Sequence, residues 1–292
     1  LSACDPYDSL YDVELLFTGF DRPLMVKQLR KVFSEKYDIL LTIGYIFTRV
    51  AAEFYTKFEY GDVCTTTIFT GVKWPVEQGI VRSVKKPGGQ MTGIVREGPS
   101  PLMQAYFIER LTMSFNKIVI PYSPHSEGGY LLEQSRLISF FLKEKGGFKV
   151  DFVPLDDTET AAATIEPHLE RGTELVLFLE GCMLSEAVPS ISALCQEYGV
   201  YLFGDGPEAV KAGADFGYGG NNEIFADKAF KMIRKICEQG ADPATLSLTV
   251  VSNNRSYWVN TRLLDRGILS RQDIKQLEQE LETKVHWLDT VN

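Results

Sequence analysis

Residues that build metal and redox sites are scarce in this sequence. Of its 292 residues, 5 are cysteine and 3 are histidine, and no two cysteines stand in a Cys-x-x-Cys spacing. No cysteine clusters with histidine, so neither a zinc site nor a thioredoxin-like motif is indicated. His125 has no histidine or cysteine near it in the sequence, which argues against a metal role. We therefore expect no metal and no cofactor.

Positive charge is also in short supply. Lys and Arg number 30 against 39 Asp and Glu, a net charge of −9 that argues against a nucleic-acid partner. No apolar run reaches the roughly 18–20 residues that a membrane-spanning helix needs. A Gly-x-Ser-x-Gly motif, a Walker loop and a Rossmann Gly-x-Gly-x-x-Gly motif are all absent. We therefore expect no catalysis.

The cysteines give little support to disulfides. Cys182 and Cys195 are 13 positions apart on an expected helix, which separates them by ~20 Å, too far for a bond. Cys64 and Cys237 could pair only through the tertiary fold. Buried free thiols are the simpler interpretation.

Cys4 stands in a different context. The sequence opens Leu1-Ser2-Ala3-Cys4, the pattern that a lipoprotein signal peptidase cuts before the cysteine becomes the lipidated N-terminus. This predicts a secreted protein made with a signal peptide and anchored to a membrane by a lipid on Cys4. The alternative is a plain strand or an expression remnant.

Apolar strands alternate with amphipathic helices along the chain. The composition, 45% apolar and 24% charged, is that of a folded protein, and the length fits one large domain or two lobes. Strand–helix alternation predicts an α/β fold with parallel sheets. The expected strands are 13–18, 38–43, 65–69, 117–120, 149–154, 174–179, 200–203 and 246–251. The expected helices are 24–36, 47–55, 101–113, 129–145, 158–171, 184–198, 222–240 and 271–288.

The two halves of the chain have the same organisation. The segment Gly93–Pro101 is the expected crossover between them, and the glycine-rich Gly217–Asn222 is a second point where the chain could cross back. We therefore predict an N-terminal lobe of residues 1–95 plus 218–247, and a C-terminal lobe of residues 96–217 plus 248–292.

A charge and an indole follow directly after one expected strand. The strand stops at Thr70-Gly71, and Lys73 and Trp74 come next. In open α/β sheets, ligands bind outside the carboxyl ends of the strands, so these side chains should face a binding site. The later Pro87-Gly88-Gly89 corner should turn the chain into the last strand of the first half.

Five segments of the sequence together resemble a known family. They are YDILLTIG, IFTGVKWPVEQGIVRSVKKPGGQMTGI, KIVIPYSPHSEGG, VYLFGDGPEAVKAGADFGYG and RLLDRGI, in this order. They are similar to the type I substrate-binding proteins of ABC transporters, and most to the subfamily of tryptophan- and tyrosine-binding lipoproteins. The resemblance runs from Val13 to Ile268, and the Thr70–Val76 block followed by Lys86–Gly93 is its most specific part.

The resemblance implies a fold and a function. The expected fold is that of type I periplasmic binding proteins: two doubly wound, Rossmann-like lobes, joined by three hinge strands, that close on a small ligand in the cleft between them. The expected function is an extracytoplasmic solute-binding component of an ABC importer, periplasmic or at the cell surface, whose partners are an ABC permease and ATPase. The ligand that the resemblance implies is a small amino-acid-like molecule, and the subfamily implies that it is aromatic.

Ten residues at expected strand ends are the candidate ligand contacts. A zwitterionic ligand needs a cation for its carboxylate and an acid for its ammonium group, and aromatic side chains would flank an aromatic ring. The cations are Arg49 and Lys73, the acids Glu127, Glu180 and Asp205, the rings Tyr45, Trp74 and Tyr122, and Thr70 and Ser126 complete the set. Ser126, Glu127 and Asp205 are assigned because they match polar positions of the family.

Each of these assignments has a plainer alternative. Tyr45 could pack at the edge of the core, Arg49 could form a surface ion pair, Lys73 could be merely solvated, and Asp205 could cap a helix. The loops Gly44–Arg49 and Leu179–Cys182 also differ from the small polar loops of the family, so the chemistry of the pocket need not be the same.

Three alternative functions remain open at this stage. One is a sensor or regulatory protein of the same fold, and another is an α/β enzyme. The third is a scaffold lipoprotein that no longer closes, because only a short segment precedes Val13 where the family has a further strand and helix.

Overall fold

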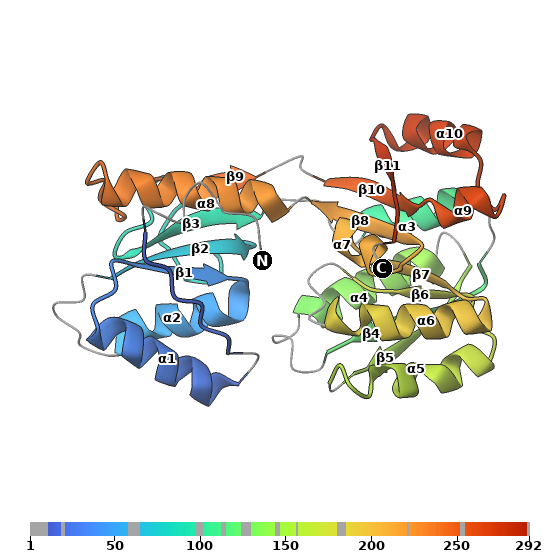
Figure 1. Ribbon diagram of the computed structural model, residues 1–292, viewed down its shortest axis with the longest axis horizontal. Helices are drawn as coiled ribbons and strands as arrows, with labels where there is room; N and C mark the ends of the chain where they lie inside the picture. Colours follow the sequence, from blue (N-terminus) through green and yellow to red (C-terminus); the bar gives the residue numbers. More distant parts are fainter. Residues whose placement is uncertain are drawn as a thin grey trace. The chain divides into compact units, whose positions relative to one another are not determined.

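The chain folds into two compact units, each with its own sheet (Figure 1). The computed structural model describes residues 11–18, 21–57, 65–96, 102–111, 115–123, 130–143, 147–155, 157–179, 185–220, 222–251 and 255–290. Unit 1 is Leu1–Arg96 with Phe225–Val251, and unit 2 is Glu97–Ile224 with Ser252–Asn292. The α/β fold with parallel sheets that the alternation predicts is confirmed.

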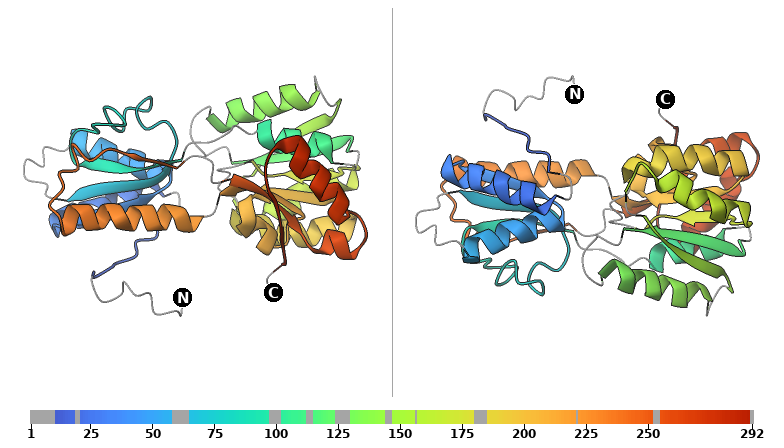
Figure 2. Two further views of the ribbon diagram at one scale, coloured as in Figure 1. Left: turned by 90° about the horizontal axis from the view of Figure 1, so that it is seen from above. Right: turned by 90° about the horizontal axis from the view of Figure 1, so that it is seen from below.

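Unit 1 is built on a parallel sheet in the order β1-β2-β3-β9. Its strands are β1 (Ile39–Ile43), β2 (Thr66–Val72), β3 (Met91–Arg96) and β9 (Thr249–Val251). Its helices are α1 (Arg22–Ser34), α2 (Tyr45–Lys57) and α8 (Asn222–Cys237). α1 and α2 share one apolar core with Leu40 and Phe69 of the sheet, and α8 runs along β9 and β3 (Figure 2).

The boundaries of α1 follow from its sequence. The Asp21 carboxylate accepts a hydrogen bond from the Leu24 amide at 3.0 Å, which caps the helix at its N-terminus. The apolar positions Met25, Leu29 and Phe33 lie at helical spacing and are buried. The predicted helix is therefore confirmed.

The expected strand at 13–18 is wrong. These residues belong to no strand of the described chain. Tyr11 instead stacks edge-on against Phe230 of α8, with ring centroids 5.6 Å apart, and Glu14 bonds to Lys31 and Tyr37. Residues 13–18 thus have the alternating pattern of a strand but no neighbouring strand among the described residues to form backbone hydrogen bonds with.

Glycines shape the entry to β3. Gly88 and Gly89 have φ of 74° and 84°, values that glycine adopts without strain, and β3 starts at Met91. Gly93 within β3 has no room for a side chain, because an added Cβ would lie 2.3 Å from the carbonyl oxygen of Phe69. The Pro-Gly-Gly corner therefore turns the chain into β3, as expected.

Unit 2 carries the larger sheet, in the order β11-β10-β8-β7-β6-β4-β5 among the described residues. Its pairs are parallel except for β8 with β10. The strands are β4 (Lys117–Tyr122), β5 (Lys149–Pro154), β6 (Leu175–Leu177), β7 (Tyr201–Asp205), β8 (Phe216–Gly220), β10 (Arg255–Asn260) and β11 (Val285–Leu288). The helices are α3 (Leu102–Arg110), α4 (Tyr130–Phe141), α5 (Ala161–Glu170), α6 (Val188–Tyr198), α7 (Gly206–Lys211), α9 (Arg262–Asp265) and α10 (Arg271–Leu281), with a 3₁₀ turn at Ser185–Ala187.

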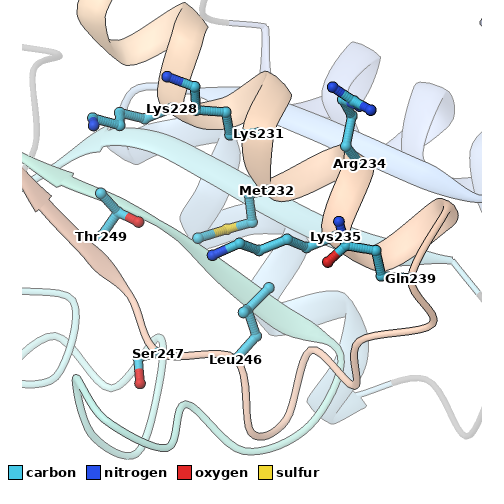
Figure 3. Close-up of a pocket in the computed structure, with 9 residues that line it drawn as sticks. All are labelled: Lys228, Lys231, Met232, Arg234, Lys235, Gln239, Leu246, Ser247 and Thr249. Atoms are coloured by element: carbon cyan, nitrogen blue, oxygen red, sulfur yellow. The ribbon is translucent and has the colours of Figure 1, made fainter.

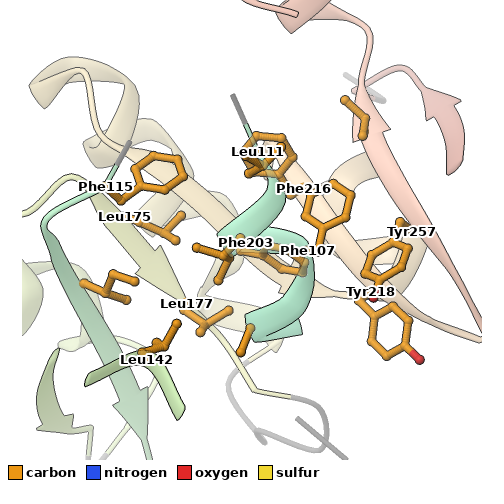
Figure 4. Packing of buried hydrophobic residues seen from close by; sticks show 14 of the residues in the cluster. Phe107, Leu111, Phe115, Leu142, Leu175, Leu177, Phe203, Phe216, Tyr218 and Tyr257 are labelled. Carbon is orange, nitrogen blue, oxygen red and sulfur yellow. The ribbon is translucent and has the colours of Figure 1, made fainter. Parts of the chain in front are cut away.

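Aromatic rings fill the centre of one core in unit 2 (Figure 4). Phe107 of α3 stacks on Tyr257 of β10 with ring centroids 4.5 Å apart, and it meets Phe203 and Phe216 edge-on. Aromatic pairs of this kind add about 0.5–1.5 kcal/mol beyond the area that they bury. This core therefore fixes α3 against the strands β7, β8 and β10.

The expected C-terminal helix 271–288 is too long. A capping box of Ser270 and Asp273 starts α10, and Glu282 ends it with a left-handed φ of 49°. Residues Val285–Leu288 then pair in parallel with β10 as β11. The apolar spacing is helical only up to Leu281, which explains the difference.

The divisions between the units differ from the predicted lobes by one residue at the first crossing, where Arg96 belongs to unit 1, and by several residues at the last two. The sequence places residues 218–224 in the first lobe and 248–251 in the second, whereas the structure places them the other way round. β8 pairs with β7 and β10 of the unit 2 sheet, and β9 pairs with β3 of the unit 1 sheet. The pairing therefore assigns β8 to unit 2 and β9 to unit 1.

Two cysteines lie among the described residues, and both are free thiols. Cys195 is buried, as expected, but Cys237 near the end of α8 is exposed, so its predicted burial is wrong. Cys4, Cys64 and Cys182 lie outside the described residues. Within the described ranges, no helix has the length and apolar character to cross a bilayer.

Candidate functional site

Two strand ends meet in unit 1, at the carboxyl edge of the sheet. The Gly44 amide after β1 donates to the Thr70 carbonyl in β2 at 2.9 Å, and Gly44 has a φ of 83°. The chain then enters α2 at Tyr45, which is half-buried against the core of the unit. The Thr48 hydroxyl donates back to the Gly44 carbonyl at 2.6 Å and holds this turn in place.

The strand β2 ends three residues beyond the expected strand 65–69. Thr70 is buried within it, and a bulge at Gly71, between Thr70 and Val72, carries the strand to Val72. Lys73 and Trp74 therefore follow the strand directly, as candidates at its carboxyl end should. Trp74 is 51% exposed and has a φ of 48°, a left-handed conformation that is rare for a bulky residue.

Gln78 connects the candidates of unit 1 to one another. Its carbonyl accepts a hydrogen bond from Arg49 at 2.6 Å, and its side-chain amide donates to the Lys73 carbonyl at 2.9 Å. Its backbone amide donates to the Trp74 carbonyl at 3.1 Å. Gln78, which the sequence analysis missed, thus joins the Arg49 side chain to the backbone of Lys73 and Trp74.

Arg49 is already engaged in this arrangement. Besides the Gln78 carbonyl, its guanidinium faces Glu53 at 3.6 Å, one turn along α2. Its side chain is still 42% exposed. The surface ion pair that was the plainer interpretation is therefore present, in a geometry that leaves part of the guanidinium open to solvent.

Unit 2 presents two candidates at strand ends. Tyr122 is the last residue of β4 and Asp205 the last of β7, and β6 lies between these strands. Two strand spacings of ~4.8 Å put the two ends about 10 Å apart. That separation suits two contacts on one small molecule.

Asp205 occupies the N-cap position of α7, the place that the capping alternative predicts. Its backbone is extended, with φ of −87° and ψ of 97°, but its side chain forms no capping hydrogen bond with the helix. Gly219 in β8 lies close by, because an added Cβ there would be 3.1 Å from Asp205 Oδ1. The carboxylate is therefore half-buried at the strand end and is not used as a cap.

A buried amide lies behind the end of β6. Gln104 of α3 is fully buried and donates from Nε2 to the Phe178 carbonyl at 2.9 Å. Its Oε1 accepts no hydrogen bond from the described residues. No motif of the sequence singles Gln104 out, since a glutamine in an amphipathic helix predicts a surface position.

Four of the predicted residues belong to segments that the structure does not describe. Ser126, Glu127, Glu180 and the lipidation candidate Cys4 all lie outside the described residues. No group of His, Cys, Asp and Glu that could hold a metal ion occurs in the ranges that the structure describes. The candidates that the structure describes are thus aromatic and cationic residues in unit 1 and, separately, a tyrosine and a carboxylate in unit 2.

Comparisons with known proteins point to one family. A family model described as ABC transporter substrate binding protein matches residues 20–282. No curated protein matches the sequence of this chain.

Solved structures share the fold at low sequence identity. An ABC domain from Streptococcus pneumoniae, in complex with L-Trp, gives a TM-score of 0.70 at 17% identity over 92% of this chain and 86% of that one. A conserved domain protein from Vibrio cholerae gives 0.68 at 17% over 91% and 83%. A LacI transcriptional regulator from Bacteroides fragilis gives 0.55 at 12% over 86% and 84%. The type I periplasmic binding protein fold is therefore confirmed.

Proposed function

Because the chain belongs to the family of ABC transporter substrate-binding proteins, we propose that it binds a small, aromatic amino-acid-like solute for an ABC importer. The family accounts for solute binding and for a place beside an ABC transporter. The aromatic character of the ligand and the residues that hold it are our proposal.

The grouping of Trp74, Lys73 and Arg49 around Gln78 is the observation that carries this proposal. An exposed indole and two cationic residues at the same end of the sheet fit a ligand that has both a ring and a carboxylate. The related fold from Streptococcus pneumoniae was solved with L-Trp, a ligand of this class. Tyr45 would add a second ring at the neighbouring strand end.

Asp205 is the proposed partner of the ligand's ammonium group. Its carboxylate is half-buried at the end of β7 and makes no capping bond to α7. Tyr122, two strands away, would lie beside the ligand. Ser126, Glu127 and Glu180 stay in the proposal as further contacts.

Calorimetry with tryptophan, tyrosine and phenylalanine tests the proposal. Loss of a hydrogen-bonded charge partner in a closed site typically costs ~2–5 kcal/mol, so Asp205→Asn should weaken binding about 30-fold or more. Asp265→Asn, an exposed aspartate of α9 in the same unit, is the matched control and should bind as the unchanged protein does. Tight binding of an uncharged sugar or nucleoside, with none of the three amino acids bound, would overturn the assignment.

The same experiment separates the alternatives. Chemical conversion of a bound solute would identify an enzyme, and mass spectrometry of the titrated solution would detect it. A regulator of this fold would bind the solute equally well, so an importer requires a second measurement: stimulation of a permease–ATPase pair by the loaded protein.

Location and movement are further parts of the proposal. We propose that the protein works outside the cytoplasm, anchored by a lipid on Cys4. The native protein should then enter a detergent phase, and Cys4→Ala should release it to the aqueous phase. We also propose hinge closure on the solute, for which solution scattering should give a smaller radius of gyration when solute is added.

A further inference from the structure

A second group of cations lies at the opposite edge of the unit 1 sheet. A pocket of about 370 Å³ opens between α8 and the segment that leads into β9 (Figure 3). Leu246 in its wall precedes β9 and bonds to Thr92 near the start of β3, so the pocket lies toward the amino ends of these parallel strands. The candidate solute contacts lie at the carboxyl ends. The lining residues are Lys228, Lys231, Met232, Arg234, Lys235, Gln239, Leu246, Ser247 and Thr249.

The wall opposite α8 is held in place by hydrogen bonds to the rest of unit 1. The Thr92 hydroxyl donates to the Leu246 carbonyl at 2.8 Å, and the Leu248 amide donates to the Val84 carbonyl at 2.8 Å. These bonds join the two sequence segments of unit 1, residues 1–96 and 225–251. The pocket is therefore formed before any ligand arrives, which lowers the cost of binding.

Three lysines of α8 share one face of the helix. Lys228, Lys231 and Lys235 occupy positions i, i+3 and i+7, which place their side chains on the same side. In Figure 3 the Lys235 side chain extends between Met232 and Leu246. Lysine ammonium groups on flexible stems can converge on one anionic group from such positions.

Two of the pocket's cations are neutralised and two are not. Lys231 pairs with Asp227 at 2.8 Å, and Arg234 pairs with Glu238 at 3.0 Å. Within the described part of the chain, no carboxylate pairs with Lys228 or with Lys235. The pocket therefore keeps an excess of two positive charges, in a protein whose net charge is −9.

The other lining residues add hydrogen-bond donors and an apolar surface to the pocket. The Ser247 hydroxyl donates to the Lys85 carbonyl at 2.9 Å, so it has no second hydrogen to donate to an anion. The Thr249 hydroxyl and the Gln239 side-chain amide belong to lining residues, and both can donate a hydrogen bond. Met232 is 4% exposed and Leu246 lies across from it, so part of the surface favours an apolar group.

We propose that this pocket is a second binding site, for a phosphate monoester that carries a small apolar group. A phosphate monoester has a charge of about −1.5 to −2 at pH 7, which matches the two uncompensated lysines better than a single carboxylate does. Its oxygens accept from the ammonium groups and from Thr249, and its apolar part packs on Met232. The phosphoryl group can belong to a soluble ester or to the headgroup of a membrane lipid.

Phenyl phosphate is the probe for a soluble ester. Calorimetry should detect binding that weakens as salt is added, because salt screens the lysine charges. Lys228→Gln/Lys235→Gln should lose at least about tenfold in affinity, as removal of charge-assisted bonds predicts. Lys149→Gln/Lys275→Gln makes the same change of charge at two exposed lysines of unit 2 and should leave binding unchanged. Asp205→Asn should leave it unchanged as well, which separates this site from the solute site.

Vesicles of phosphatidylcholine with and without phosphatidic acid probe the lipid source. Sedimentation of the protein with the phosphatidic acid vesicles alone, lost in Lys228→Gln/Lys235→Gln, assigns the site to a lipid headgroup. Binding of phenyl phosphate but not of vesicles assigns it to a soluble ester. The proposal is overturned if neither probe binds, or if the pocket variant and its control lose binding equally. Thermal unfolding of both variants verifies that each is folded.

Discussion

Arg262 donates two hydrogen bonds to one oxygen of Asp215, from Nε at 3.0 Å and from Nη2 at 2.8 Å. The other carboxylate oxygen accepts from the Leu202 amide at 2.9 Å. Asp215 is 5% exposed, and burial, as the largest cause, raises its pKa above the ordinary value for an aspartate. Asp215 precedes β8, Arg262 belongs to α9 and Leu202 belongs to β7, so the pair joins these three elements. It therefore stabilises the strand β7, which ends at Asp205.

Removal of one partner should destabilise unit 2 strongly. Breaking a buried pair leaves an uncompensated charge and typically costs ~3–5 kcal/mol. The Arg262 side chain is 21% exposed, so we expect Arg262→Ala to cost about 3 kcal/mol, at the lower end of that range. Trp258 and Trp287 lie in unit 2, so urea unfolding followed by tryptophan fluorescence in a Trp74→Phe background reports this unit.

The double variant Asp215→Ala/Arg262→Ala is the internal control. It removes both charges, so it should cost less than the two single changes added together. Simple additivity, or a cost of Arg262→Ala below about 1 kcal/mol, would contradict a coupled pair.

The pH dependence of stability should be smaller without Glu174. Its pKa is lowered, first by the Asn116 amide and then by the Lys117 amide, which donates to it at 3.1 Å. A carboxyl group with a lower pKa in the folded state stabilises the fold above its ordinary pKa of 4.5, and this contribution is lost as the pH falls through the folded value. Glu174→Gln should therefore lose less stability on acidification than the unchanged protein.

Unfolding in urea at a series of pH values from neutral to acidic measures this effect. Glu159→Gln, an exposed glutamate, is the matched control and should follow the unchanged protein. Parallel curves for Glu174→Gln and the unchanged protein would show that the amide bonds do not stabilise the carboxylate.

The two described cysteines should differ in reactivity. Burial raises the pKa of the Cys195 thiol to about 12, so almost no thiolate is present there at pH 8. Cys237 is exposed, although desolvation also raises its pKa. Alkylation with iodoacetamide at pH 8, followed by peptide mass spectrometry, should label Cys237 in the folded protein and Cys195 only after denaturation. Equal labelling of both in the folded state would contradict the buried position of Cys195.

The sequence predicts regular elements well and side-chain networks poorly. Apolar periodicity locates α1 and β5, because the side of each element that faces the core sets the spacing of its apolar residues. The rule that ligands bind at the carboxyl ends of strands draws attention to Lys73 and Trp74, which follow β2. Partners distant in the sequence have no local signal. Gln78 joins Arg49 to the strand end only in three dimensions. Residues 13–18 show strand alternation, but they pair with no strand among the described residues.

Short strands at the end of the chain escape prediction for a related reason. The segment Val285–Leu288 has only four residues, too few for a clear periodic pattern. It is a strand because it pairs with β10, and the sequence alone does not show that the two segments are neighbours. The family resemblance supplies the two-sheet fold as a whole. It does not supply the contacts of the loops Gly44–Arg49 and Leu179–Cys182, where this sequence departs from the family.

Replacing Trp74 by glycine and by alanine should separate its effect on stability from its effect on solute binding. Its φ of 48° is a conformation that costs an L-residue roughly 1–2 kcal/mol and costs glycine almost nothing. Trp74→Gly relieves this strain, whereas Trp74→Ala keeps it, so the glycine variant should be the more stable of the two by about 1 kcal/mol. Both variants remove the indole, and both should therefore lose affinity for an aromatic solute by the same factor. Urea unfolding and calorimetry on the pair measure the two effects separately. Equal stability of the variants would contradict the strain at this position, and full affinity in both would remove Trp74 from the solute site while leaving the role of Asp205 to its own test.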